Sequence, residues 1–394
     1  MGYELIRKCK LLLLYPFAPT LESAGFSLEV APLSKALQSV GCTLEVYWTS
    51  ARGTLESAVA YARDSGGSYR SPFGGLAKVS ELQEAASLFV YESLGRLVPP
   101  LFHLRDVKTA ISNIDGIAMN YDAVISFKPW FRTVLPTMRI SRKCHAISVL
   151  WMDDFDIAPR SPCLRWFDCV VVNSRTLAER YALLNPLLLR HTVESSLLSA
   201  RSASAANAES KSVIILFPGT GYPRQDAAHI IQEVIDSGAS EIRVINGTRV
   251  FGRERSQAKF SQGCSVSLFE KLPREQVLRM LDSSAIAVIP QTENAYGDSK
   301  TSGRLLEAMA RGLASVVPER GETSRLVTEA DCGRKYSLTR PGSLSRELRS
   351  LMFQPEEVSE RGQRALQSAR RFPSWEEHAE SLVRFISDRR HCGM

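Results

Sequence analysis

One acidic and three basic side chains share a helical spacing near residue 300. They recur at positions i, i+4, i+7 and i+11 and would form one stripe of a helix: Lys300, Arg304, Glu307 and Arg311. The start of a helix carries unsatisfied backbone N–H groups and the positive end of the helix dipole, and both favour an anion. We place Lys300 in the first turn, where an anion such as phosphate would offset the repulsion between its charge and the dipole. A solvated helix with ordinary i,i+4 charge pairs shows the same spacing.

The residues around this stripe provide signals for the two ends of the helix. Four side chains are candidates to cap its N-terminus: Asp298, Ser299, Thr301 and Ser302. Gly312 is a stop signal, and residues 314–317 are predicted to form a short buried strand that ends at Pro318. Glu307, two turns into the helix, could accept hydrogen bonds from sugar or ribose hydroxyls.

A lysine and a run of aspartates follow two predicted strands in the N-terminal half. Lys128 follows strand 121–127, while Asp153 and Asp154 follow strand 146–151. Open α/β sheets bind ligands at the carboxyl ends of their strands, so these side chains are candidate site residues. The alternative is that the aspartates cap a turn before a loop.

Two glycine-containing loops follow predicted strands. Gly25 comes after strand 10–15, and Gly219 with Thr220 comes after strand 212–217. Glycine lets the backbone approach a ligand closely, and glycines between a strand and a helix suit a phosphate-facing loop. Arg224 is the cation nearest the second loop. Each fragment alone is weak evidence, because glycine is common in turns.

Strands and helices alternate along the chain, which predicts α/β domains with parallel sheets. Besides the elements above, the pattern predicts strands at 43–48 and 187–193 and helices at 54–64, 80–96 and 104–113. The 394 residues suggest two domains. We expect an N-terminal domain at 1–195, a Ser- and Ala-rich linker at 196–211 and a second domain at 212–372, followed by an amphipathic C-terminal helix within 373–394.

The net charge of +7 suits acidic ligands such as phosphates, or an anionic membrane surface. No run of 18 apolar residues occurs, so no transmembrane helix is predicted. The eight cysteines show no CxxC pair and no metal-ligand spacing, which predicts reduced thiols in a cytoplasmic protein without a metal site. One predicted helix carries a basic cluster beside Trp130 that could contact anionic lipid or simply cap and pack the helix: Arg132, Arg139, Arg142 and Lys143.

The stretch Lys-Thr-Ser-Gly-Arg-Leu-Leu-Glu-Ala-Met-Ala-Arg-Gly at 300–312 resembles the donor-binding signature of retaining GT-B glycosyltransferases, in particular family 4, also called glycosyl transferases group 1. The resemblance implies that Glu307 is the second glutamate of a Glu-x7-Glu motif and holds the donor ribose. Ser299 stands where that motif has its first glutamate, and Ala314 replaces the usual proline. The Lys-Pro loop and the aspartate-rich turn are similar to those of one subgroup, which implies that Lys128 and Asp154 lie on the acceptor side and that Asp153 is catalytic.

The same resemblance implies two doubly wound, Rossmann-like domains that face a central cleft, with the helix in 373–394 bracing the N-terminal domain. The implied reaction is transfer of a sugar from a nucleotide-diphosphate sugar, with retention and without a metal or bound cofactor. Fixed cations must then stabilise the leaving diphosphate, a role that we give to Arg224 and Lys300. The remaining donor contacts implied in this way are Gly25, Gly219, Thr220, Ser302, Gly303, Arg304 and Glu307.

The implied acceptor is a sugar, a lipid-linked molecule or another hydroxyl compound in glycan or glycoconjugate biosynthesis. The implied location is the cytoplasm or the inner face of the membrane, and no nucleic-acid partner is expected. Two alternatives remain. The first is a sugar-nucleotide epimerase of the same fold, which would release product without an acceptor. The second is a pseudoenzyme that binds nucleotide sugar or membrane without turnover, which fits Ser299 and the lack of a lysine in the second glycine loop.

Overall fold

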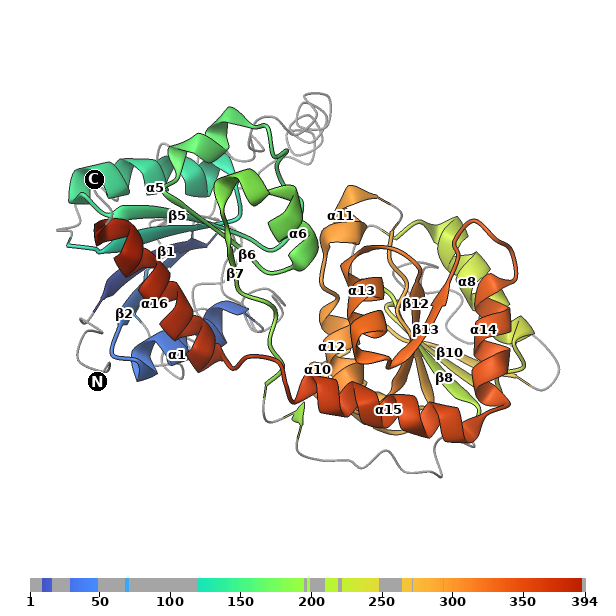
Figure 1. The fold of residues 1–394 in the computed structure, drawn as a ribbon. Coiled ribbons are helices and arrows are strands. Elements are labelled where there is room, and N and C mark those ends of the chain that lie inside the picture. The colour runs from blue at the N-terminus through green and yellow to red at the C-terminus, as the bar shows by residue number, and fades with distance from the viewer. Residues whose placement is uncertain are drawn as a thin grey trace. The chain divides into compact units, whose positions relative to one another are not determined.

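The chain divides into two compact units (Figure 1). One consists of residues 1–190 together with 373–394, and the other of residues 191–372. The computed structural model describes residues 9–15, 29–48, 68–70, 120–194, 197–198, 210–218, 222–247, 264–270, 272–292 and 294–391. Each unit is built on a parallel sheet with apolar clusters packed against it.

The first unit has the strand order β3-β2-β1-β4-β5-β6-β7. Its strands are β1 Lys10–Tyr15, β2 Thr43–Trp48, β3 Ser68–Arg70, β4 Ala123–Phe127, β5 Ile147–Met152, β6 Cys169–Val172 and β7 Leu187–Leu188. Its helices are α1 Ala31–Ser39, α5 Phe131–Cys144, α6 Arg175–Arg180 and α16 Trp375–His391, with short 3-10 helices at Pro162–Trp166 and Ala182–Leu184. The central strands are continuous apolar runs because a parallel sheet is buried on both faces.

The C-terminal helix α16 is part of the first unit and packs along α1 (Figure 1). Its apolar side chains join the core on the α1 face of the sheet: Trp375, Ala379, Leu382, Val383 and Ile386. One face of this sheet is therefore covered by helices from opposite ends of the chain.

The second unit has the strand order β10-β9-β8-β11-β12-β13, again with parallel neighbours. Its strands are β8 Ser212–Leu216, β9 Glu241–Ile245, β10 Ser265–Leu268, β11 Ile286–Val288, β12 Ala314–Pro318 and β13 Gly333–Tyr336. Its helices are α8 Arg224–Asp236, α10 Arg274–Asp282, α11 Ala295–Ser299, α12 Gly303–Ala310, α13 Gly321–Ala330, α14 Ser343–Met352 and α15 Pro355–Ala369.

Both sheets reverse their strand order beside the first strand of the unit. In the first unit β1 lies between β2 and β4, and in the second β8 lies between β9 and β11. The carboxyl ends of strands at such a reversal form the crevice where open α/β sheets bind ligands. The loops after β4, β5, β8 and β11 are therefore the places to look for chemistry.

Local prediction matches the structure best in the first two strands. The strands predicted at 10–15 and 43–48 have these bounds. The strand predicted at 187–193 was wrong in length and covers only Leu187–Leu188, since the Arg190 carbonyl bonds the ring of His378 in α16 instead of a neighbouring strand. The helices predicted at 54–64, 80–96 and 104–113 lie outside the described residues, as do Gly25, Gly219 and Thr220.

Candidate functional site

The loop after β4 holds Lys128 in a left-handed backbone conformation, with φ of 69°. Such a conformation costs a residue with a side chain on the order of 1 kcal/mol or more. Neighbouring elements hold it there: the Lys128 N–H donates to the Trp151 carbonyl of β5 over 2.9 Å, and the Lys128 carbonyl accepts from the Thr133 hydroxyl of α5 over 2.8 Å. The loop is therefore set by the sheet and by α5.

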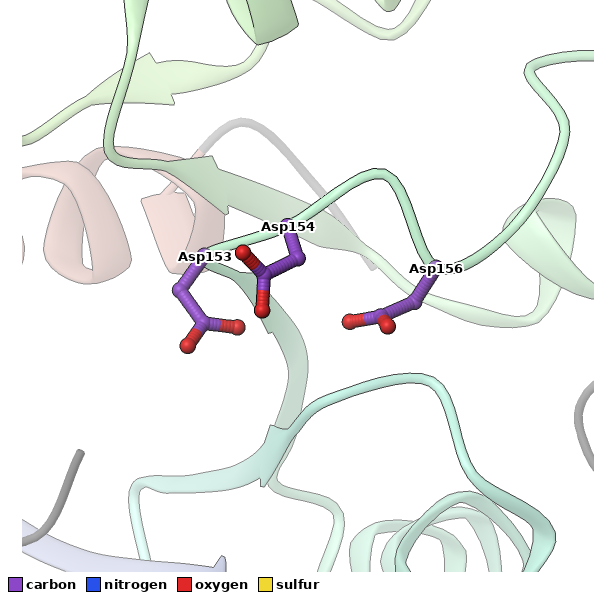
Figure 2. Close-up of side chains that lie close together, drawn as sticks. All are labelled: Asp153, Asp154 and Asp156. Atoms are coloured by element: carbon purple, nitrogen blue, oxygen red, sulfur yellow. The ribbon is translucent and has the colours of Figure 1, made fainter. Parts of the chain in front are cut away.

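The Lys128 ammonium lies among three carboxylates that follow β5. Its Nζ is 2.7 Å from Asp153, 2.5 Å from Asp154 and 3.3 Å from Asp156. Figure 2 shows that the three aspartates come from one turn and that their side chains lie close together. The structure thus brings together the three predicted residues Lys128, Asp153 and Asp154.

Asp156 is a member of this cluster that the sequence prediction did not assign. The signal was present, because Asp156 comes two residues after Asp154 in a loop, but spacing in a loop does not determine where a side chain points. Burial raises the pKa of Asp156 to about 6, and the charges of Asp154 and Asp153 add to this, while Lys128 acts in the opposite direction. Within the described part of the chain, three carboxylates lie within ion-pair distance of this one ammonium.

Three carboxylate oxygens within 4.8 Å of one another form a set of hard ligands that a divalent cation could bridge. In this cluster the Lys128 ammonium already lies within ion-pair distance of all three groups. Among the described residues, the lysine thus supplies positive charge to all three carboxylates, and we assign no metal to the cluster.

The stretch around residue 300 forms two helices instead of the single predicted one. Asn294 caps α11 by accepting from the Gly297 N–H over 2.8 Å, and Ser302 caps α12 by accepting from the Leu305 N–H over 3.4 Å. Lys300 lies between them in an extended conformation. Our placement of Lys300 in the first turn of the helix was therefore wrong, because the Asn294 cap begins a separate helix before it.

Two side chains from other elements hold the backbone of Lys300. Gln291, just after β11, donates to the Lys300 carbonyl over 3.4 Å, and the Thr323 hydroxyl of α13 donates to it over 3.5 Å. Gln291 also donates to the Thr323 hydroxyl. This triangle fixes the point where the chain enters α12.

Helix α11 is pressed against the start of α13. Arg320 donates to both carboxylate oxygens of Asp298, at 2.7 and 2.5 Å. A Cβ on Gly321 would lie only 2.7 Å from the Asp298 backbone, so glycine is required at this contact.

Ser299 is fully buried, and its hydroxyl donates to the Ala295 carbonyl of its own helix. The position of the motif's first glutamate is thus taken by a buried residue that bonds within α11.

Glu307 is buried between two arginines. Its Oε1 accepts from Arg274 Nε over 3.0 Å and its Oε2 from Arg304 Nη1 over 2.9 Å, while the Glu307 side chain is only 6% exposed. Arg274 also donates to Glu194 over 2.9 Å. Burial tends to lower the pKa of Arg274, but the bonds to Glu194 and Glu307 outweigh it and raise that pKa.

Arg274 is a second residue that the sequence prediction missed. It begins α10 after Pro273, and 33 positions separate it from Glu307, so no local spacing links the two. The predicted pair Arg304 and Glu307 does share one helical stripe. Arg311, the fourth member of the predicted stripe, lies 3.6 Å from Asp282 at the end of α10.

The remaining predicted donor residues lie at the entrances of two helices. Arg224 is the exposed first residue of α8, after the loop that follows β8. Ser302 and Gly303 form the cap and the first residue of α12.

Among the described residues, no helix is long and apolar enough to span a membrane.

Comparisons with solved structures match nearly the whole chain. Sucrose-phosphate synthase from Thermosynechococcus elongatus is 11% identical, with a TM-score of 0.67 over 98% of this chain and 100% of that one. Anabaena HepE in complex with UDP-glucose is 12% identical, with a TM-score of 0.62 over 98% and 100%. A putative UDP-N-acetylglucosamine 2-epimerase from Listeria monocytogenes is 12% identical, with a TM-score of 0.56 over 99% of this chain and 98% of that one.

The chain has the GT-B fold. This confirms the predicted class of two Rossmann-like, doubly wound units. No protein-family model matches the sequence, and no curated protein is similar to it in sequence. Within the GT-B fold, Lys128 with its aspartates follows strands of the first sheet, and Lys300 with α12 follows β11 of the second, so both clusters lie at carboxyl ends of strands.

Proposed function

We propose that this protein is a glycosyltransferase that moves a sugar from a nucleotide-diphosphate sugar to an acceptor hydroxyl. The observation that carries the proposal is Glu307, buried near the entrance of α12 and bonded by Arg274 and Arg304. The likeness to HepE, whose structure contains UDP-glucose, supports a donor of the nucleotide-sugar class.

Glu307 is suited to bind the ribose of such a donor. An ionised carboxylate offers about four lone-pair positions, and the two arginines use one on each oxygen. The remaining positions can accept hydrogen bonds from two adjacent hydroxyls. The two arginines fix the orientation of the Glu307 carboxylate, which reduces the entropy lost on binding.

The diphosphate would bind at the entrance of α12. The first N–H groups of a helix lack partners within the helix, and the dipole there favours an anion. Gly303 and Arg304 supply these amides, and Lys300 lies three residues before Gly303. Arg224 with Gly219 and Thr220 would approach from the loop after β8. Charge that develops on the leaving diphosphate would then be stabilised by fixed cations and amides, without a metal.

The acceptor would bind at the cluster of the first unit. Carboxylates of Asp153 and Asp154 can accept hydrogen bonds from sugar hydroxyls, and Lys128 holds them in place. The loop that carries Gly25 would complete this side. Retention at the anomeric carbon is the stereochemical outcome that we propose, on the strength of the resemblance at residues 300–312.

Nucleotide release from a panel of nucleotide sugars tests the proposal, with and without candidate acceptors and with a chelator present. We expect release with at least one donor, an increase when a hydroxyl acceptor is added, and no loss with the chelator. Proton NMR of the product then reports whether the anomeric configuration is kept. If no donor binds and no nucleotide is released, the proposal is wrong.

The epimerase remains a second candidate, because the Listeria structure matches 99% of this chain. An epimerase would convert the nucleotide sugar or release free sugar without any acceptor. Binding without turnover would point to a pseudoenzyme, which the buried Ser299 in the place of the first glutamate makes a third outcome to test.

A further inference from the structure

Two cysteines lie side by side at the start of the first unit's sheet. Cys9 precedes β1 and Cys42 precedes β2, and the strands pair from the next residues onward, Lys10 with Thr43. The Thr43 N–H donates to the Cys9 carbonyl over 2.8 Å, so the parallel register continues through the cysteines. Adjacent strands lie about 4.8 Å apart, and a disulfide needs Cα atoms roughly 4.4–6.8 Å apart. The backbone is therefore already within range of a disulfide.

The two side chains also point to the same place. Both belong to the apolar cluster on the α1 and α16 face of the sheet, where Cys9 is 8% and Cys42 4% exposed. Both are free thiols. The two thiols are close enough that a hydrogen-bond interaction between them shifts the pKa of each.

These contacts make the two thiols unequal. The bond from the Cys9 thiol, with the Cys9 amide, lowers the pKa of Cys42, although burial and Asp122 act in the opposite direction. The same bond raises the pKa of Cys9, and burial adds to this. The charged groups that face the pair are Asp122, before β4, and Arg390 of α16, which form an ion pair with each other. Cys42 is therefore the thiol of the pair with the lower pKa.

The other cysteines in the described part of the chain have the opposite character. Burial raises the pKa of Cys169 and of Cys332 to about 12. Burial also raises the pKa of Cys144, Cys163 and Cys264. The thiolate is the reactive form of cysteine. An oxidant should therefore react with Cys42 before it reacts with the other described cysteines.

We propose that Cys9 and Cys42 form a redox modification site, a dithiol that peroxide converts reversibly into a disulfide. The Cys42 thiolate attacks one oxygen of hydrogen peroxide, the O–O bond breaks, and Cys42 becomes a sulfenic acid as water is released. The Cys9 sulfur then attacks the Cys42 sulfur and expels hydroxide, which leaves as water with the Cys9 proton. Two thiols are oxidised by two electrons, and one peroxide is reduced to two waters.

The disulfide would join the two ends of a chain segment that includes the loop carrying Gly25. Closing this segment restricts the unfolded chain and should stabilise the unit reversibly. The proposal rests on β1 and β2 alone and is independent of the proposed transfer reaction.

Peroxide titration of the folded, full-length protein tests the site. The sample is alkylated under denaturing conditions, digested without reductant and analysed by mass spectrometry. We expect a linked pair of peptides containing Cys9 and Cys42 at the lowest peroxide dose that modifies any cysteine, and loss of the link with dithiothreitol. The temperature of unfolding should rise on oxidation and return on reduction.

Three variants separate the steps. In Cys9→Ala, dimedone should trap a sulfenic acid on Cys42; in Cys42→Ala, Cys9 should stay alkylatable at the same dose. Cys169→Ala is the matched buried control and should still form the link. The proposal is overturned if Cys9 and Cys42 both remain alkylatable while other cysteines are oxidised. It is also overturned if the link forms only after the protein has been denatured.

Discussion

Arg274 Nε lies 3.0 Å from Glu307 Oε1, although 33 positions separate the two residues. Arg274 comes from the start of α10 and Glu307 from the interior of α12, and Arg274 extends the contact to Glu194. The carboxylate that we assign to the donor ribose is therefore held from outside its own helix.

Arg274→Met should weaken donor binding and also lower stability. It leaves the 6%-exposed Glu307 carboxylate with one guanidinium fewer, which costs about 1–3 kcal/mol. Isothermal titration with nucleotide diphosphate and a denaturant melt measure the two effects. Arg279→Met, an exposed arginine on the same helix, is the control. If both variants behave alike, Arg274 does not position Glu307.

Lys300→Ala should weaken binding of the diphosphate and leave stability nearly unchanged. A lost charge-assisted contact to phosphate costs about 1.5–3 kcal/mol, roughly ten- to a hundredfold in affinity. Lys335→Ala, an exposed lysine on β13, should change neither quantity. Affinity within twofold of the wild type in the Lys300 variant would mean that this lysine is only a surface charge.

Thr323→Val should weaken donor binding less than Lys300→Ala does. Valine keeps the volume but removes the hydroxyl that bonds the Lys300 carbonyl and Gln291, so the loop before α12 loses one support. Since the effect acts through Lys300, the double variant should bind no more weakly than Lys300→Ala alone. Thr328→Val on the same helix, whose hydroxyl bonds Ser324 instead, should bind normally. Additive losses in the double variant would contradict this coupling.

Asp156→Asn should remove the loss of stability that ionisation of Asp156 causes as the pH rises through about 6. The pKa of Asp156 is raised in the folded protein, from 3.8 to about 6. A raised pKa means that folding favours the protonated form, so this contribution to stability is complete below pH 3.8 and is lost as the pH rises through 6.

Asparagine resembles the protonated carboxyl at every pH. The variant should therefore be as stable as the wild type near pH 4 and more stable at pH 7. Unfolding temperatures measured across this range decide the matter. A variant that is less stable than the wild type at pH 7 would show that the Asp156 charge is needed by Lys128.

The basic end of α5 should bind anionic vesicles in a salt-dependent way. Arg139, Arg142 and Lys143 are exposed on its last turns. Each basic side chain near an anionic surface contributes about 1 kcal/mol, and salt screens this attraction. Sedimentation with anionic vesicles at low and high salt, compared with a variant carrying Gln at all three positions, measures it. If the protein stays in the supernatant with anionic vesicles at low salt, these residues do not bind the membrane and have only a structural role.

The sequence by itself determined the elements whose signals are local. The strands at 10–15 and 43–48 have the predicted bounds: the first is a run of leucines buried on both faces, and the second alternates buried apolar residues with Thr43 and Glu45. Ser302 caps α12 and Gly312 follows its end, since capping depends on residues a few positions apart. The alternation of these elements predicted α/β domains with parallel sheets, and the resemblance at 300–312 implied the GT-B class.

Tertiary structure decided the contacts between elements. The break at Lys300 depends on α11 packing against α13, where Gly321 leaves room for the Asp298 backbone. Asp156 meets Lys128, and Arg274 meets Glu307, only because parallel strands and their helices bring distant loops to one edge of a sheet. Charged side chains carry no local signal of their partner, since an ion pair can join any two parts of the chain that the fold places within reach.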